Sequence, residues 1–131
     1  MISNKFKPVL ELVSEIGRKL VVWQDEADLR VMHSEEAFKT EADRQAHEIL
    51  SNGLATLFPN IPVISEEDMS HSHKRPSEYW LIDPIDGTAS WYNGFNGFVS
   101  QAALIINGIP IFGVIHAPKM ESTWCAESGK G

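Results

Sequence analysis

Two aspartates three residues apart, Asp83 and Asp86, are the residues of this sequence best suited to chemistry. They follow the apolar residues 80–82 and are separated by Pro84 and Ile85. Carboxylate oxygens are the preferred ligands of Mg²⁺, which is usually held by one or two carboxylates together with phosphate and water. Side chains three apart on a strand face opposite ways, but Pro84 fixes φ and forces a bend that turns both carboxylates toward one cation. The carbonyl of Ile85 is expected to be a third oxygen ligand.

The residues around this pair suit phosphate binding. Gly87 permits a backbone conformation closed to other residues, and Thr88 offers a hydroxyl and an N–H group where a short helix or turn is expected to begin. Glu66, at the end of another expected strand, is predicted to join the metal ligands from a neighbouring edge. The alternative interpretation is a plain strand-to-loop corner, because Asp-Pro and Asp-Gly are common turn dipeptides.

The residues 40–43, Thr-Glu-Ala-Asp, form the pattern of a capping box at the start of a helix. The Thr40 hydroxyl accepts from an early backbone N–H group, and the acidic residues of the first turn complement the helix dipole. Apolar residues then recur at helical spacing. This helix is expected to end near Phe58, because Pro59 cannot continue it.

The elements along the chain predict an α+β fold, in which two N-terminal helices pack on a mainly antiparallel sheet. Apolar residues at helical spacing predict the first helix over 5–23, and 24–39 is expected to be a helix extension followed by a loop. Strands are expected at 62–65, from 80 onward, and at 98–106, 109–116 and 122–126, with Asn107-Gly108 as a two-residue hairpin turn. No closing helix follows, so one sheet face is expected to be uncovered.

The composition limits the classes of function. The 131 residues, 43% hydrophobic and 22% charged, predict one globular domain. A formal net charge of −7 argues against a nucleic-acid polymer or an acidic membrane surface as partner, and an anionic ligand would need a bound cation. The single cysteine, Cys125, excludes an intrachain disulfide and a cysteine-rich metal site. No apolar stretch predicts a membrane segment or a signal peptide, and a cytoplasmic location is expected.

Three segments in order resemble the inositol monophosphatase-like superfamily of Mg²⁺-dependent, lithium-sensitive phosphatases. They are Thr-Glu-Ala-Asp at 40–43, Ser-Glu-Glu-Asp at 65–68, and the apolar strand followed by Asp-Pro-Ile-Asp-Gly-Thr at 83–88. Residues 58–68 and 113–118 look most like the 3'(2'),5'-bisphosphate nucleotidase branch. The resemblance implies that residues 1–131 are the N-terminal metal- and phosphate-binding domain of the sugar-phosphatase-like α/β layered fold, with the C-terminal domain absent.

The resemblance also implies a set of metal ligands. Glu66, Asp83 and the Ile85 carbonyl would bind one metal, and Asp83 and Asp86 would be shared with a second. The implied cofactor is two or three Mg²⁺ ions, with inhibition by Li⁺.

Catalytic and substrate-binding roles follow from the same resemblance. Asp43 would pair with Thr88 to activate the attacking water while also capping its helix, and Glu66 would contribute to catalysis. Asp86, Gly87 and Thr88 would bind the phosphate of the substrate.

The activity implied by the resemblance is hydrolysis of a small phosphorylated metabolite. The first candidate is adenosine 3',5'-bisphosphate, giving AMP and phosphate, and the second is an inositol or sugar monophosphate. The sequence departs from the nucleotidase branch at Ala89-Ser90-Trp91, where Lys-Glu-Phe is typical. One rival is an inactive half-phosphatase that acts as a binding or assembly module, its open sheet covered by a second copy or a complementing chain. Another is a cation-binding structural domain.

Overall fold

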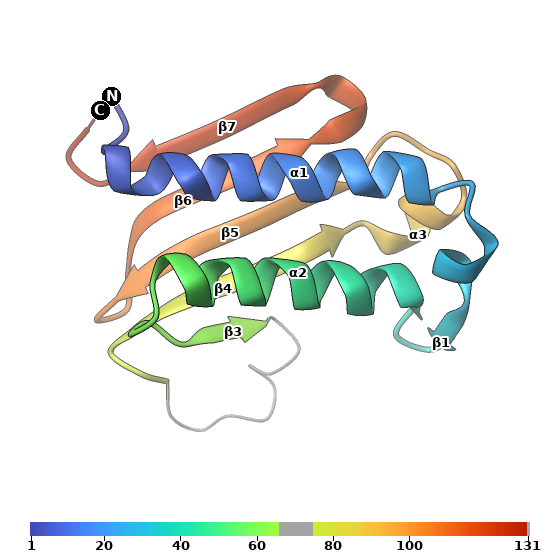
Figure 1. Ribbon diagram of the computed structural model, residues 1–131, viewed down its shortest axis with the longest axis horizontal. Coiled ribbons are helices and arrows are strands. Elements are labelled where there is room, and N and C mark those ends of the chain that lie inside the picture. The colour runs from blue at the N-terminus through green and yellow to red at the C-terminus, as the bar shows by residue number, and fades with distance from the viewer. Residues whose placement is uncertain (66–74, 131) are drawn as a thin grey trace.

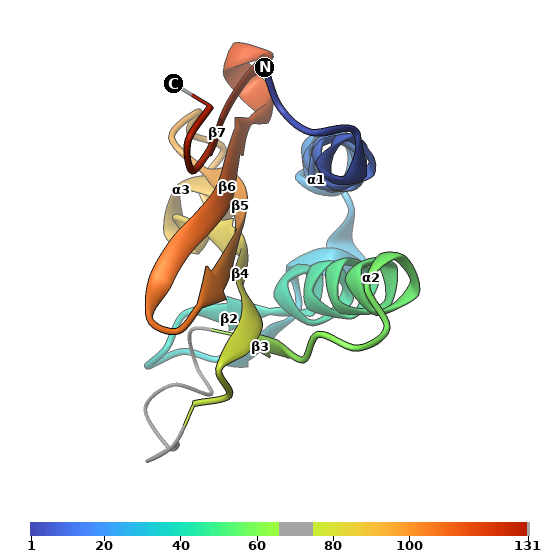
Figure 2. The same ribbon diagram turned by 90° about the vertical axis from the view of Figure 1, so that its left-hand side faces the viewer.

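A computed structural model describes residues 1–65 and 75–130 and shows two helices packed on one face of a five-stranded sheet (Figure 1). The helices α1 (Lys7–Trp23) and α2 (Glu41–Leu57) lie side by side on the same face (Figure 2). The predicted α+β fold is therefore confirmed. The other helical elements are short: η1 (Asn4–Phe6), η2 (Ala27–Arg30), α3 (Thr88–Tyr92) and η4 (Pro118–Met120).

The sheet has the strand order β3-β4-β5-β6-β7. Its strands are β3 (Val63–Ser65), β4 (Glu78–Asp86), β5 (Val99–Ile106), β6 (Ile109–Ala117) and β7 (Ser122–Glu127). The pair β3–β4 is parallel and the other three pairs are antiparallel. The sheet is therefore mainly antiparallel, as predicted. Asn107 and Gly108 both have positive φ, 51° and 79°, which the two-residue turn predicted there requires.

The core lies between the helices and the sheet. Both helices bury an apolar stripe, and the largest buried side chains include Phe6, Trp80 and Phe112. The rings of Phe6 and Phe112 are stacked with centroids 4.3 Å apart, and Trp80 meets both edge-on. Burial of each such ring contributes about 2–3 kcal/mol. This core holds β4, and with it the residues of the site, against α1 and α2.

Neither of the long helices α1 and α2 covers the opposite face of the sheet (Figure 2). We call it the outer face. Ile115 of β6 and Trp124 of β7 are register partners on this face and are 41% and 52% exposed. In the described part of the chain, the outer face thus exposes apolar side chains of β6 and β7.

The segment 24–39 is not the helix extension and loop that the sequence predicts. It contains η2 and a small antiparallel hairpin of β1 (Met32–Ser34) and β2 (Lys39–Thr40). The hairpin is held by tertiary contacts, since the ring of Phe38 packs edge-on against that of Tyr92, with centroids 5.6 Å apart. These contacts outweigh the weak local preferences of a mixed-charge segment.

The N-terminal residues lie beside the end of β7 (Figure 1). Ser3 donates its backbone N–H and its hydroxyl to the two carboxylate oxygens of Glu127, each at 2.7 Å. We call this contact the terminal clasp.

Along the described chain, no helix combines the length and the apolar character needed to cross a membrane.

Candidate active site

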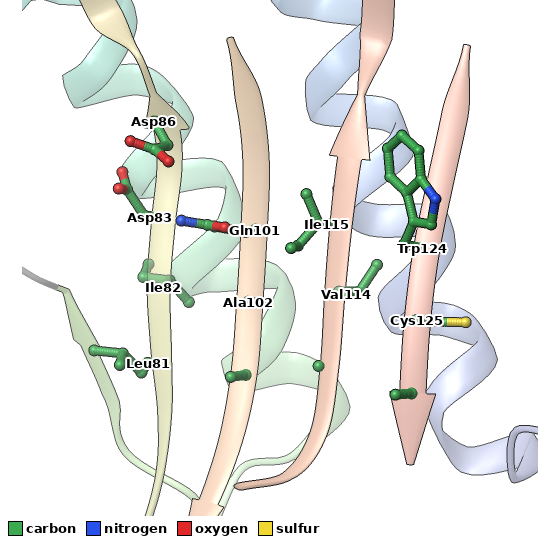
Figure 3. Close-up of a pocket in the computed structure, with 13 residues that line it drawn as sticks. Leu81, Ile82, Asp83, Asp86, Gln101, Ala102, Val114, Ile115, Trp124 and Cys125 are labelled. Atoms are coloured by element: carbon green, nitrogen blue, oxygen red, sulfur yellow. The ribbon is translucent and has the colours of Figure 1, made fainter. Parts of the chain in front are cut away.

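A β-bulge in β4 places Asp83 and Asp86 on the same face of the sheet. Asp83 pairs with Gln101 of β5 and Asp86 pairs with Val99, so three steps along β4 match two steps along β5. Side chains two apart on a strand share a face, and the extra residue of a bulge therefore brings Asp86 to the side of Asp83. Figure 3 shows the two carboxylates next to each other at the end of β4, with Gln101 beside Asp83.

The bend expected at Pro84 is this bulge. Proline has no N–H group to give to a strand ladder, and within sheets it is tolerated at bulges. The next residue, Ile85, turns its side chain into the core and is only 3% exposed. Its carbonyl remains near the site, where it accepts a weak hydrogen bond from Thr88 Oγ1 at 3.4 Å.

Gly87 makes the turn between β4 and α3. Its φ of 90° lies in the left-handed region, where side chains other than hydrogen are strained. A Cβ atom there would also lie 3.2 Å from the backbone oxygen of Gly97. Thr88 then begins α3, so the predicted special conformation and short helix are both present.

Asp43 connects the start of α2 to the start of α3. The predicted capping box is present: Thr40 N–H and Thr40 Oγ1 donate to Asp43 Oδ2 at 2.9 and 2.8 Å, and the Asp43 N–H approaches Thr40 Oγ1 at 3.4 Å. The other carboxylate oxygen, Oδ1, accepts from Thr88 Oγ1 at 2.9 Å. The structure therefore brings together Asp43 and Thr88, which are 45 residues apart in sequence.

Contacts behind α3 hold Thr88 in place. The indole N–H of Trp91 donates to the carbonyl of Leu20 at 2.8 Å, and Gln24 Nε2 donates to the carbonyl of Trp91 at 3.1 Å. Arg30 Nη1 donates to the carbonyl of Tyr92 at 2.7 Å, and its guanidinium lies over the Tyr92 ring. The buried side chain of Trp91 thus fixes α3 to the core.

A cavity of about 400 Å³ opens beside Asp43. It lies between the β1–β2 hairpin, the first turns of α2, and the ends of β3 and β4. Its lining residues are His33, Lys39, Thr40, Asp43, Arg44, His47, Ser65, Ile82, Asp83 and Pro84. The cavity thus connects Asp43 to Asp83, one of the two carboxylates at the bulge.

Glu41, at the first position of α2, is held ionised by its neighbours. Hydrogen bonds from Arg44 above all, and then from Gln45 and His33, keep the pKa of its carboxyl well below the usual range. Its negative charge is therefore committed to these partners at the helix start.

The donors at the bulge fit Mg²⁺. The described part of the chain contains no cluster of three or more His, Cys, Asp or Glu side chains suited to a metal ion. It offers two carboxylates, Asp83 and Asp86, and the nearby carbonyl of Ile85, which matches the sparse oxygen set that Mg²⁺ accepts with phosphate and water. Glu66, the remaining predicted ligand, lies outside the described residues. Its preceding residue, Ser65, pairs with Ile82 in the parallel register of β3 and β4.

Residues 3–131 match the inositol monophosphatase family. The chain belongs to this family. Among curated relatives, a protein of Shigella flexneri named 3'(2'),5'-bisphosphate nucleotidase CysQ is 44% identical over 93 residues, covering 70% of this chain and 38% of the relative. The protein of that name in Aggregatibacter actinomycetemcomitans is 32% identical over 132 residues, covering 98% of this chain and 49% of the relative.

Solved structures of the inositol monophosphatase family share this fold. The inositol monophosphatase of Thermotoga maritima is 29% identical and superposes with a TM-score of 0.83, covering 98% of this chain and 50% of that protein. The extragenic suppressor protein SuhB of Bartonella henselae is 26% identical with a TM-score of 0.82. The chain thus spans half or less of the length of the two curated relatives and of the Thermotoga protein.

Two features of the site were not predicted from the sequence. Lys39 lines the cavity from the position just before the capping box, and Arg30 holds α3 through Tyr92. The spacing of four residues between Lys39 and Asp43 was a usable signal, because such pairs are neighbours at a helix start. Nothing in the sequence near Arg30 indicates its partner.

Proposed function

We propose that this chain is the metal- and phosphate-binding half of a Mg²⁺-dependent phosphomonoesterase that acts on a 3'(2'),5'-bisphosphate nucleotide, releasing AMP and phosphate from adenosine 3',5'-bisphosphate. The observation that carries the proposal is the bulge that sets Asp83 and Asp86 on one face, next to the Asp43–Thr88 pair. The names of the CysQ relatives support the substrate. An inositol or sugar monophosphate is the alternative substrate, supported by the family itself.

In this proposal Asp83, Asp86 and the Ile85 carbonyl hold Mg²⁺ together with Glu66, and Asp83 and Asp86 are shared between two ions. A third ion and inhibition by Li⁺ belong to the same proposal. Mg²⁺ bound there would neutralise the phosphate charge and lower the pKa of the attacking water.

The residues of the chain itself would move a proton and hold the phosphate. Because the Thr88 hydroxyl donates to Asp43 Oδ1, its oxygen is left to accept a proton from a water molecule. As the water oxygen bonds to phosphorus and the ester P–O bond breaks, the water proton would pass to Thr88 Oγ1 and the Thr88 proton to Asp43. The leaving ester oxygen would take up a proton from solvent. The phosphate would lie beside Asp86, against the backbone of Gly87 and Thr88.

A phosphate-release assay tests this function. The chain would be incubated with adenosine 3',5'-bisphosphate or inositol 1-phosphate, with and without Mg²⁺. We expect Mg²⁺-dependent release, faster from the nucleotide. No turnover of either substrate at any Mg²⁺ concentration would contradict the activity of this chain.

A metal-binding measurement tests the ligands separately from turnover. Mn²⁺ binding can be followed by electron paramagnetic resonance in the wild type and in Asp83→Asn, which should lose the site. Asp25→Asn, at an exposed aspartate, is the control and should bind Mn²⁺ like the wild type. Unchanged binding in Asp83→Asn would remove Asp83 from the ligand set.

A second candidate function is a binding or assembly module without turnover. Exposure of Trp124 and Ile115 on the outer face favours it, because exposed apolar clusters mark interaction surfaces. The occupant would be a second copy or a complementing chain. Sedimentation should then show self-association or complex formation that Trp124→Lys abolishes, whereas a monomeric chain with full phosphatase activity would contradict this candidate.

A further inference from the structure

Gln101 of β5 is the neighbour of Asp83 across the sheet. The two residues are register partners in the antiparallel pair β4–β5, and the Cβ atoms of such partners lie about 4.5–5.5 Å apart. Both residues line a cavity of about 650 Å³ on the outer face, together with Asp86. The carboxamide of Gln101 is therefore within reach of a carboxylate oxygen of Asp83.

The surroundings of Gln101 give its carboxamide one polar direction. Its register partner on the other side is Ile115 of β6. The residues two positions away on β5, Val99 and Ala103, share its face of the sheet and are also apolar. Among the described residues the Gln101 side chain forms no hydrogen bond, so its two N–H groups are available to a carboxylate that turns toward them.

The Gln101 carboxamide points from β5 toward β4, with its nitrogen toward Asp83 (Figure 3). This direction fits the chemistry, because an ionised carboxylate only accepts hydrogen bonds whereas a carboxamide nitrogen donates two. Asp86 lies beside Asp83 in the same view, and two neighbouring carboxylates repel each other. A donor that holds Asp83 from the side of β5 would keep one of its oxygens directed at a shared cation.

We propose that Gln101 is a positioning residue for the metal site. When a divalent cation is bound, Gln101 Nε2 donates to one carboxylate oxygen of Asp83 and leaves the other oxygen for the cation. This inference rests on the proposed function, in which Asp83 is a metal ligand. Carboxylates that bind a metal are commonly held by such a hydrogen bond, and its loss weakens metal affinity about 10- to 100-fold. The competing role of Gln101 is packing on the sheet surface, without effect on the cation.

Mn²⁺ affinity separates the two roles. Mn²⁺ would be titrated into the chain without substrate and followed by electron paramagnetic resonance. Gln101→Met keeps the length of the side chain but removes the donor, and should weaken Mn²⁺ binding about tenfold or more. Ile115→Met places the same side chain at the other register partner of Gln101 and should bind Mn²⁺ like the wild type. Unchanged affinity in Gln101→Met, or an equal loss in Ile115→Met, would overturn the proposal.

A second readout uses the wild type alone. The carboxamide signals of Gln101 would be followed by NMR while Mg²⁺ is added to the ¹⁵N-labelled chain. One of the two carboxamide protons should shift downfield, because one N–H group faces Asp83, whereas the carboxamide of the exposed Asn52 on α2 should not move. Unmoved Gln101 signals at saturating Mg²⁺ would overturn the proposal. If the wild type binds neither Mn²⁺ nor Mg²⁺, the metal site of the proposed function fails as well.

Discussion

The two carboxylate oxygens of Asp43 have different partners. Oδ2 accepts from the backbone and hydroxyl of Thr40, and Oδ1 accepts from Thr88 while facing Lys39. One side chain therefore both begins a helix and contacts the residue proposed to receive the water proton. The two roles can be separated by changing the partners instead of Asp43.

Thr40→Ala should mainly lower stability, whereas Thr88→Val should mainly lower activity. Thr40→Ala removes the N-cap oxygen and should lower the free energy of unfolding by about 1 kcal/mol with little change in phosphate release. Thr88→Val keeps the cap but removes the hydroxyl, and should slow phosphate release by about 10²-fold or more, the typical contribution of general acid–base catalysis. Urea unfolding and the phosphate assay measure the two effects. Equal loss of activity in both variants would show that the capping role and the catalytic role of Asp43 cannot be separated.

The cap could be predicted from the sequence, but the pairing with Thr88 could not be predicted from the residues alone. A capping box is a local pattern of four residues, and its geometry is fixed by the helix start. The Asp43–Thr88 contact joins residues 45 apart, and only the family resemblance indicated it. The place of Lys39 in the cavity lining was missed because it depends on the hairpin of β1 and β2, which the sequence does not predict.

The helix α3 has five residues and is too short to be stable alone. Arg30 fixes its end by donating from Nη1 to the carbonyls of Gln24 and Tyr92, at 3.1 and 2.7 Å. The guanidinium carbon also lies 4.1 Å from the centre of the Tyr92 ring. Because Thr88 opens this same helix, these contacts at its end position the site.

Arg30→Met should loosen α3 before the rest of the fold. Loss of the two hydrogen bonds and the ring contact should lower the free energy of unfolding by about 2 kcal/mol. The amide of Trp91, which donates to the Gly87 carbonyl at 3.0 Å, should exchange with solvent faster. Arg30→Lys should be intermediate, and the exposed Arg75→Met is the control. Unchanged exchange at Trp91 in Arg30→Met would show that Arg30 does not hold α3.

The regular elements could be predicted from the sequence because their apolar periodicity is strong. The hairpin at 32–40 could not, since its strands have two and three residues and depend on the contact between Phe38 and Tyr92. The bulge in β4 was anticipated only as a bend at Pro84. A bulge is a property of two paired strands, and the register of β4 against β5 cannot be read from one of them.

At the scale of the whole molecule, α1 packs closely on the sheet. A Cβ atom at Gly17 would meet the ring of His116 on β6 at 2.3 Å. His116 is 8% exposed, and its Nδ1 contacts Thr123 Oγ1 of β7 at 2.7 Å. Burial, and then the positive charge of Arg18, lower the pKa of His116 below its ordinary value of 6.5.

This histidine should make stability depend on pH. The folded state holds His116 neutral, whereas the unfolded state takes up a proton near 6.5, so stability should fall as the pH drops below 6.5 and level off below the folded-state pKa. Urea unfolding between pH 7.5 and 5, above the ordinary pKa of glutamate, should show this slope. His116→Gln should reduce the slope. If stability falls with pH equally in the wild type and in His116→Gln, other titrating groups cause the pH dependence.

Because of the terminal clasp, the order of the elements along the chain can be changed while their arrangement in space stays the same. Ser3 and Glu127 are 124 residues apart, yet their hydrogen bonds hold η1 against the end of β7. A short peptide linker between the two ends would therefore require little rearrangement of the fold. The chain could then be opened at the exposed Asn107-Gly108 turn, so that β6 and β7 come before α1 in a circular permutant. Asp43, Asp83 and Thr88 would remain on one uninterrupted stretch of chain.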